Sequence, residues 1–336
     1  MKAYSSARDE YSGTNAILLD ANENPFESEV NRYPDPYQRR LKEKISEIKK
    51  VPPSQIFLGN GSDEAIDLIL RIFCEPGVDN IVSIDPSYGM YQVAADIHNI
   101  NVIKAPLKSD FSLQADEVIK CADSHTKIIM LCSPNNPSGN LLESAKIEQI
   151  ISQFHGIVVL DEAYIDFAQA ESFIHRLDKY PNLIVLQTFS KAWGMAGVRL
   201  GLAYASEEII RLFNKVKPPY NINQLTQDFV FKKLNQLEVF EAELKEVVKE
   251  RDRLSQALDQ LEITEHVYPS DSNFLLVRFR QAERIFNNLY EQKIILRDRS
   301  RVRYGKDCLR ITVGTRHEND KLLEALKNEE KSIIYR

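Results

Sequence analysis

Residues 187–201 read QTFSKAWGMAGVRLG and follow the apolar run 183–186. The run predicts a short buried strand. Lys191 stands just beyond it, next to Ser190, and Arg199 follows eight positions later. An ammonium group in apolar company loses hydration, so its pKa should fall and its amine should become nucleophilic. A lysine that only extends its charge to solvent at a strand end is the ordinary alternative.

The flanking residues favour the chemical interpretation. Ser190 and Arg199 are good partners for a phosphate group. A lysine that forms a Schiff base beside a phosphate site indicates pyridoxal 5'-phosphate (PLP). The rest of the chain should then supply an anchor for each remaining part of that cofactor.

Size and composition limit the function classes. The chain has 336 residues, of which 43% are hydrophobic, enough for one large two-part domain or two domains. Its net charge of -6 argues against a nucleic-acid binder. No run of about 18 apolar residues predicts a membrane span. The first residues lack the apolar segment of a secretion signal.

Cysteine and histidine spacing point to a cytoplasmic protein without a metal site. Four cysteines lie far apart, which is typical of reduced and mostly buried thiols: Cys74, Cys121, Cys132 and Cys308. The six histidines show no metal-ligand spacing.

Short apolar runs alternate with helical patterns along the first two thirds of the chain. The predicted strands cover residues 56–58, 81–84, 102–103, 128–132, 157–160, 183–186 and 200–204. Continuous apolar strands between helices predict an α/β fold with a mostly parallel sheet covered on both faces. Polar residues follow the strand ends, where open α/β sheets bind ligands.

The turn GNGSDE, residues 59–64, leads into a predicted helix with Ser62 as N-cap. Such a helix start offers N–H groups to an anion. Glu64 stands where a dinucleotide fingerprint has glycine, and no Gly-Lys-Ser/Thr follows. Both failures disfavour a nucleotide-binding α/β protein.

Three parts are expected in the chain. Residues 1–30 form a polar arm that needs another surface, and residues 51–230 form the large domain. Residues 31–50 and 231–336 form a smaller α+β domain. Residues 225–261 are expected to be one long connecting helix.

Side chains past the strand ends match the remaining needs of PLP. Asp161 ends an apolar strand and, if buried, requires a cationic partner such as a pyridinium; a helix N-cap is the alternative. Tyr164 and Asn136 could hold the ring oxygen, and Tyr88 could stack on the ring. Each of these three could also be structural, as a core tyrosine or a turn residue.

Eight motifs resemble those of the fold-type I PLP aminotransferases, and among them the histidinol-phosphate aminotransferase family. They are residues 19–25 (LDANENP), 32–36 (RYPDP), 59–64 (GNGSDE), 86–91 (PSYGMY), 133–139 (SPNNPSG), 161–164 (DEAY), 190–199 (SKAWGMAGVR) and 309–314 (LRITVG). The resemblance runs nearly end to end. It implies a large PLP-transferase domain with a mostly parallel central sheet, plus the smaller α+β domain.

The resemblance also implies residue roles. Lys191 would bond to the cofactor aldehyde and carry the 1,3-proton transfer, and Asp161 would pair with the pyridinium nitrogen. Tyr164 and Asn136 would hold the ring oxygen, and Tyr88 would stack. The cofactor phosphate would be held by Ser62, Asp63, Thr188, Ser190 and Arg199.

Members of this family are homodimers with sites at the subunit interface, so the arm would lie on a partner subunit. Tyr33 is similar to a tyrosine that crosses into the neighbouring site. Tyr4 resembles an arm tyrosine that covers the substrate.

The substrate end is expected to carry two arginines. Arg310 matches the arginine that most such aminotransferases use for a substrate carboxylate, and Arg297 adds a second guanidinium. Two forked cations suit a phosphate. Arg299, Arg301 and Arg303 are assigned to a solvated edge strand.

The resemblance implies transfer of an amino group between L-histidinol phosphate with 2-oxoglutarate and imidazole acetol phosphate with L-glutamate, a step of histidine biosynthesis. The alternatives are an aromatic amino-acid aminotransferase and a threonine-phosphate decarboxylase. A ligand sensor that keeps the fold without turnover is a third possibility.

Overall fold

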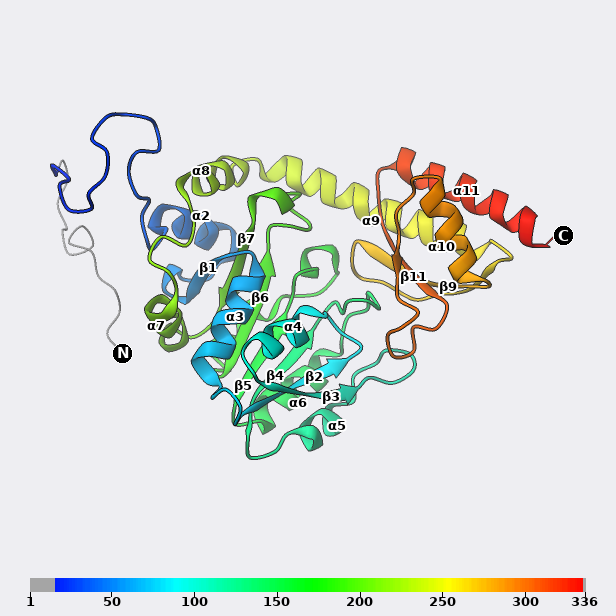
Figure 1. Cartoon of the computed structure of the whole chain (residues 1–336), viewed down its shortest axis with the longest axis horizontal. Helices are drawn as coiled ribbons and strands as arrows, with labels where there is room; N and C mark the ends of the chain where they lie inside the picture. Colours follow the sequence, from blue (N-terminus) through cyan, green and yellow to red (C-terminus); the bar gives the residue numbers. More distant parts are fainter. Residues whose placement is uncertain (1–15, 335–336) are drawn as a thin grey trace.

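The computed structural model describes residues 16–334, and it contains two sheets (Figure 1). The large sheet has seven strands in the order β1-β7-β6-β5-β4-β2-β3. Their bounds are Ile56–Asn60 (β1), Asn80–Asp85 (β2), Asn101–Pro106 (β3), Thr126–Cys132 (β4), Ile157–Asp161 (β5), Leu183–Thr188 (β6) and Leu200–Tyr204 (β7). Strands β2 to β6 are parallel, and β7 runs antiparallel to β6 and β1. The predicted mostly parallel α/β sheet is confirmed, with β3 at its edge.

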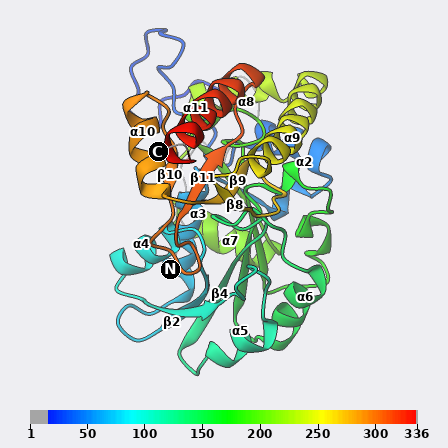
Figure 2. The same cartoon turned by 90° about the vertical axis from the view of Figure 1, so that its right-hand side faces the viewer.

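Helices cover both faces of this sheet, which is why its strands are apolar throughout. On β5, Val158 and Leu160 belong to one apolar cluster and Val159 belongs to another. Helices α4 and α6 lie on opposite sides of the sheet (Figure 2). The helices packed on it are α3 (Ser62–Phe73), α4 (Met90–Ile97) and α7 (Glu207–Val216) on one face, and α5 (Ala115–Cys121) and α6 (Ser144–Gln153) on the other.

Helix α2 (Arg39–Lys49) packs with the large sheet. Its Leu41 and Ile45 lie in the same apolar cluster as Ile56 and Leu58 of β1. The same cluster also includes Leu276 of the small sheet, so the assignment of residues 31–50 to the small domain stays a prediction. The apolar spacing predicts a helix but does not say which sheet the helix covers. All the domain boundaries stay predictions.

The small sheet is antiparallel, in the order β10-β11-β9-β8. Its elements are β8 (Thr264–Val267), β9 (Phe274–Phe279), α10 (Ala282–Glu291), β10 (Arg297–Asp298), β11 (Cys308–Thr312) and α11 (Arg316–Ile334). Leu258, Val277, Leu309 and Leu326 are among the residues of its core. The expected compact α+β lobe is present.

Two helices connect the sheets where one was expected. Helix α8 (Gln224–Lys233) ends in a turn, and α9 (Leu237–Asp259) continues toward the small sheet (Figure 1). Near its start, Phe240 stacks on Trp193 with ring centroids 3.8 Å apart. Near its end, Leu254 and Leu258 enter the small core. Every helix within residues 16–334 is too short or too polar to span a bilayer.

Candidate active site

The predicted site residues gather at one edge of the large sheet. Asp161 and Thr188 end the parallel strands β5 and β6. Tyr88 and Asn136 stand in the loops after β2 and β4, and Lys191 in the turn after β6. The carboxyl ends of parallel strands meet at one edge, so sequence-distant side chains converge there.

Asp161 is a buried carboxylate without a cationic partner in ion-pair contact among the described residues. Its side chain accepts a hydrogen bond from Tyr91 Oη at 2.7 Å and another from the Ala163 amide at 3.0 Å. Burial raises the pKa of Asp161 to about 6, although both hydrogen bonds act in the opposite direction. No α-helix follows directly, only the 3₁₀ turn Ile165–Phe167, so the N-cap alternative fails.

Tyr164, Asn136 and Arg310 form a chain between the two sheets. Asn136 Nδ2 donates to Tyr164 Oη at 3.4 Å, and Arg310 Nη1 donates to Asn136 Oδ1 at 2.6 Å. Burial raises the pKa of Tyr164 and lowers that of Arg310. The chain therefore presents a phenol, an amide and a guanidinium side by side.

The Lys191 side chain faces the hydrogen-bonded series of Tyr164, Asn136 and Arg310. Its Nζ lies 5.8 Å from the centroid of the Tyr164 ring. Burial and the charge of Arg310 lower the pKa of Lys191, while Asp161 partly offsets them. The residue as a whole remains open to solvent. A lysine that is partly desolvated but still accessible to solvent suits a role in which its amine reacts with an aldehyde.

An anion cradle lies at the start of α3. Gly61, not the predicted Ser62, occupies the N-cap, with φ 80° and no side-chain cap. Arg199 reaches the same turn, because its Nη2 lies 3.5 Å from Asp63 Oδ2. A Cβ on Gly61 would lie 2.8 Å from that Nη2. The turn thus keeps a helix N-terminus and a guanidinium together, an arrangement that favours an anion.

The β6–β7 connection closes the cradle. The Ser190 amide donates to Thr188 Oγ1 at 3.1 Å, and Arg199 adopts the left-handed conformation at φ 57°. Gly201 lets β7 approach α3, since a Cβ there would lie 2.1 Å from the Ser62 nitrogen. These residues bring together the five predicted phosphate partners.

Tyr88 links the cradle to Asp161. Its hydroxyl donates to Asp63 Oδ1 at 3.4 Å, and its ring packs edge-on against Tyr91 with centroids 5.5 Å apart. Burial, with Asp63 and Asp161 nearby, raises the pKa of Tyr88 to about 12. Tyr91, which bonds to Asp161, was missed because only the fold reveals a contact across 70 positions.

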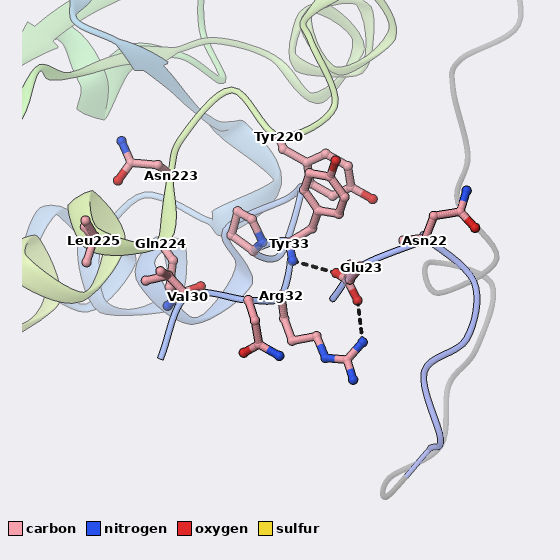
Figure 3. Close-up of a pocket in the computed structure, with 12 residues that line it drawn as sticks. Asn22, Glu23, Val30, Arg32, Tyr33, Tyr220, Asn223, Gln224 and Leu225 are labelled. Atoms are coloured by element: carbon pink, nitrogen blue, oxygen red, sulfur yellow. Dashed lines mark hydrogen bonds and ion pairs between the residues drawn. The ribbon is translucent and has the colours of Figure 1, made fainter. Parts of the chain in front are cut away.

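The arm lies apart from this cluster. Tyr33 stacks on Tyr220 with ring centroids 4.4 Å apart. Together they line a surface hollow of about 520 Å³ beside α8 (Figure 3). The role of Tyr33 in a partner's site stays a prediction, and Tyr4 lies outside the described residues.

The arginines of the small sheet differ in exposure. Arg297 is exposed and pairs across β10–β11 with Arg310. Arg301 is exposed, and Arg303 pairs with Asp85 at 2.6 Å, so both are surface residues as expected. Arg299 is partly buried, so its assignment to a solvated strand was wrong. The sequence carried no signal for this burial, because β10 comprises only Arg297 and Asp298 and both are exposed.

Two observations test whether PLP fits. A pyridinium nitrogen would supply the cation that the buried Asp161 lacks, and the α3 cradle sets a helix N-terminus beside the Arg199 guanidinium, which suits a dianion. The donor set therefore fits the cofactor. No group of three metal-ligating side chains lies together in the described part of the chain.

Residues 12–326 match the family of class I and II aminotransferases. The histidinol-phosphate aminotransferase of Parabacteroides distasonis is 53% identical, over 98% of this chain and 95% of the relative. That of Bacteroides fragilis strain YCH46 is 55% identical, over 97% and 95%. The solved histidinol-phosphate aminotransferase from Clostridium acetobutylicum superposes with a TM-score of 0.83 at 26% identity, over 90% of this chain and 92% of that one.

Proposed function

The chain belongs to the class I and II aminotransferases, and from this premise we propose that it converts L-histidinol phosphate and 2-oxoglutarate to imidazole acetol phosphate and L-glutamate. The observation that carries the proposal is the 53% and 55% identity to named histidinol-phosphate aminotransferases over nearly the whole chain. The reaction belongs to histidine biosynthesis, and we place the enzyme in the cytoplasm.

Bound PLP supplies the aldehyde that takes up the amino group and a ring that withdraws electrons from the reacting carbon. Lys191 would bond to that aldehyde between turnovers. Its Nζ would then accept the proton that leaves the amine-bearing carbon of the substrate. Its lowered pKa supports this role, because more of the amine is unprotonated near neutral pH.

The other residues of the site would hold the cofactor. The Asp161 carboxylate would keep the ring nitrogen protonated, and Tyr164 and Asn136 would donate to the ring oxygen. Tyr88 would lie against the ring. The phosphate would be bound by Ser62, the backbone N–H of Asp63, Thr188, Ser190 and Arg199. The Asn136–Tyr164 and Ser190–Thr188 hydrogen bonds and the Arg199–Asp63 ion pair support these assignments.

At the substrate end, Arg310 and Arg297 would bind the anionic group, since they are cross-strand partners. We also propose a homodimer in which the arm covers the partner, with Tyr33 and Tyr4 near the partner's site. The exposed apolar side chains of the described arm, Ile17, Leu19 and Phe26, support such a contact.

Two measurements test the function. Adding L-histidinol phosphate to the purified holoenzyme should bleach the visible band of the cofactor and produce the amino form of the vitamin. The steady-state kcat/KM should favour histidinol phosphate over phenylalanine by at least about tenfold. A preference for phenylalanine would support the aromatic alternative, and release of carbon dioxide from threonine phosphate would support the decarboxylase. Binding without turnover would indicate a sensor.

A further inference from the structure

Three arginines share one face of the small sheet. Arg297 lies directly opposite Arg310 across the β10–β11 pair. The Arg299 amide donates to the Cys308 carbonyl at 2.9 Å, which extends the same ladder by one residue. Side chains two positions apart along a strand leave the same face. Arg299 therefore projects on the side of Arg297 and Arg310.

Within residues 16–334 the Arg299 guanidinium forms no ion pair at contact distance, and Asp298 attracts it only from farther away. Its Nε is buried and has no hydrogen-bond partner in this part of the chain. The neighbouring Asp298 carboxylate instead accepts the Ser300 amide at 2.8 Å. By contrast, Arg303 on the same loop is paired with Asp85. A buried polar group without a partner is costly, so a bound anion gives the arrangement a physical reason.

The electrostatics of Arg299 place it at the substrate end of the site. Burial, and after it the charges of Arg310 and Arg297, lower the pKa of Arg299 to about 10, while Tyr164 and Asp298 act in the opposite direction. Arg310 in turn donates to Asn136. An anion beside Arg299 would therefore lie near the phenol and amide of the site, away from the α3 cradle that would hold the cofactor phosphate.

We propose that Arg299 is a third guanidinium for the phosphate monoester of the substrate. The inference rests on the function proposed above and names a binding residue for that same site. A carboxylate carries one charge and is matched by a single forked arginine. A phosphate monoester carries between one and a half and two charges near neutral pH and has three terminal oxygens. Three convergent cations suit the second group.

The test compares holoenzymes of the wild type, Arg299→Ala and Arg301→Ala. Arg301 is exposed on the same loop and serves as the matched control. Inorganic phosphate is the probe, and its Kd is measured by calorimetry with the cofactor in place. Arg299→Ala should raise this Kd by at least about tenfold, and Arg301→Ala by less than about twofold. The KM for histidinol phosphate should rise more than the KM for glutamate.

Equal phosphate Kd values in Arg299→Ala and Arg301→Ala would overturn the assignment of Arg299. If Arg299→Ala loses cofactor, Arg299→Gln keeps most of the stem packing and is measured instead, with the same expected rise. A wild type that turns over histidinol phosphate while Arg299→Ala keeps its phosphate affinity contradicts only this inference. A wild type that does not turn it over, while Arg299→Ala loses phosphate affinity, contradicts only the proposed function.

Discussion

Asp161 shows how one buried carboxylate couples stability to cofactor binding. Its pKa in the folded chain, about 6, lies above the ordinary value of 3.8. The fold therefore favours the protonated form. The stability that this group contributes is complete below pH 3.8 and is lost as the pH rises to about 6, a change of about 3 kcal/mol. Above pH 6 the ionised Asp161 carboxylate lowers the stability of the fold, and a bound pyridinium would offset this loss.

Replacing Asp161 with Asn should stabilise the cofactor-free protein and lower its affinity for the cofactor. The amide carries no charge to desolvate, so the free energy of unfolding at pH 8 should rise by on the order of 2 kcal/mol. Urea titrations at pH 8 and pH 5 measure this difference, which should shrink at the lower pH. A gain of the same size at both values would contradict the argument.

The hydrogen bond from the Tyr91 hydroxyl should lower the pKa of Asp161. Tyr91→Phe removes the 2.7 Å hydrogen bond but keeps the buried ring, so the pKa of Asp161 should rise further. The cofactor Kd, followed by absorbance from pH 8 to pH 5, should begin to rise at a higher pH than in the wild type. Tyr204→Phe is the control, because Tyr204 is equally buried and its hydroxyl has no partner within the described chain. A purely structural Tyr91 would leave the profile unchanged.

At the scale of elements, the site depends on how closely β7 approaches the start of α3. Gly59 of β1 pairs with Gly201 of β7, directly beside the turn at Gly61. A side chain at Gly201 would meet backbone atoms of Ser62, which cannot rotate away. The two elements that carry the anion cradle are thus packed backbone to backbone.

Gly201→Ala should therefore displace the first turn of α3. We expect a loss of roughly 1–3 kcal/mol in stability and a cofactor affinity lowered by at least about tenfold. Thermal unfolding and cofactor titration measure the two effects. Gly197→Ala is the control, since a Cβ at Gly197 meets nothing within 4 Å. Equal behaviour of the two variants would show that the close approach is unimportant.

Elements were predictable where local pattern and burial agree. The strands of the large sheet are buried on both faces, so each is a continuous apolar run in the sequence. Two local details were not predictable. Gly61 takes the cap position that Ser62 was expected to fill, and Leu234 is buried in a turn where one continuous helix was expected. Apolar periodicity passes through such a turn without interruption.

The site was predictable only in part, for a related reason. Motif residues after strand ends could be named, because parallel strands share one edge. The hydrogen bond from Tyr91 to Asp161 joins helix α4 to the end of strand β5, which only the fold brings together. The burial of Arg299 depends on the β10–β11 pairing, and β10 has only two residues, too few for a pattern.

On the scale of the whole molecule, apolar side chains gather on the arm and on α8. Leu225 and Phe229 of α8 are 69% and 46% exposed, and Phe26 of the arm is 80% exposed. Leu225 and Tyr33, which follows the arm, line the same hollow (Figure 3). Large exposed apolar groups in one region are typical of a protein–protein contact.

Leu225→Glu should shift the proposed homodimer toward the monomer, because it places a charge in that contact. Sedimentation velocity should give a wild-type mass of twice the 38.6 kDa chain and a smaller average mass for the variant. Tyr290→Glu is the control, since Tyr290 is 61% exposed on α10, at the other end of the molecule (Figure 1). Identical masses for both variants would exclude α8 from the interface.

The Arg310–Asn136 hydrogen bond joins the small sheet to a loop of the large one. An arriving anion competes with the Asn136 amide oxygen for the same guanidinium donors. We therefore expect each binding event to loosen this seam and each product release to re-form it. The relative tilt of the two lobes would then differ, in each turnover, between the substrate-bound and the empty enzyme.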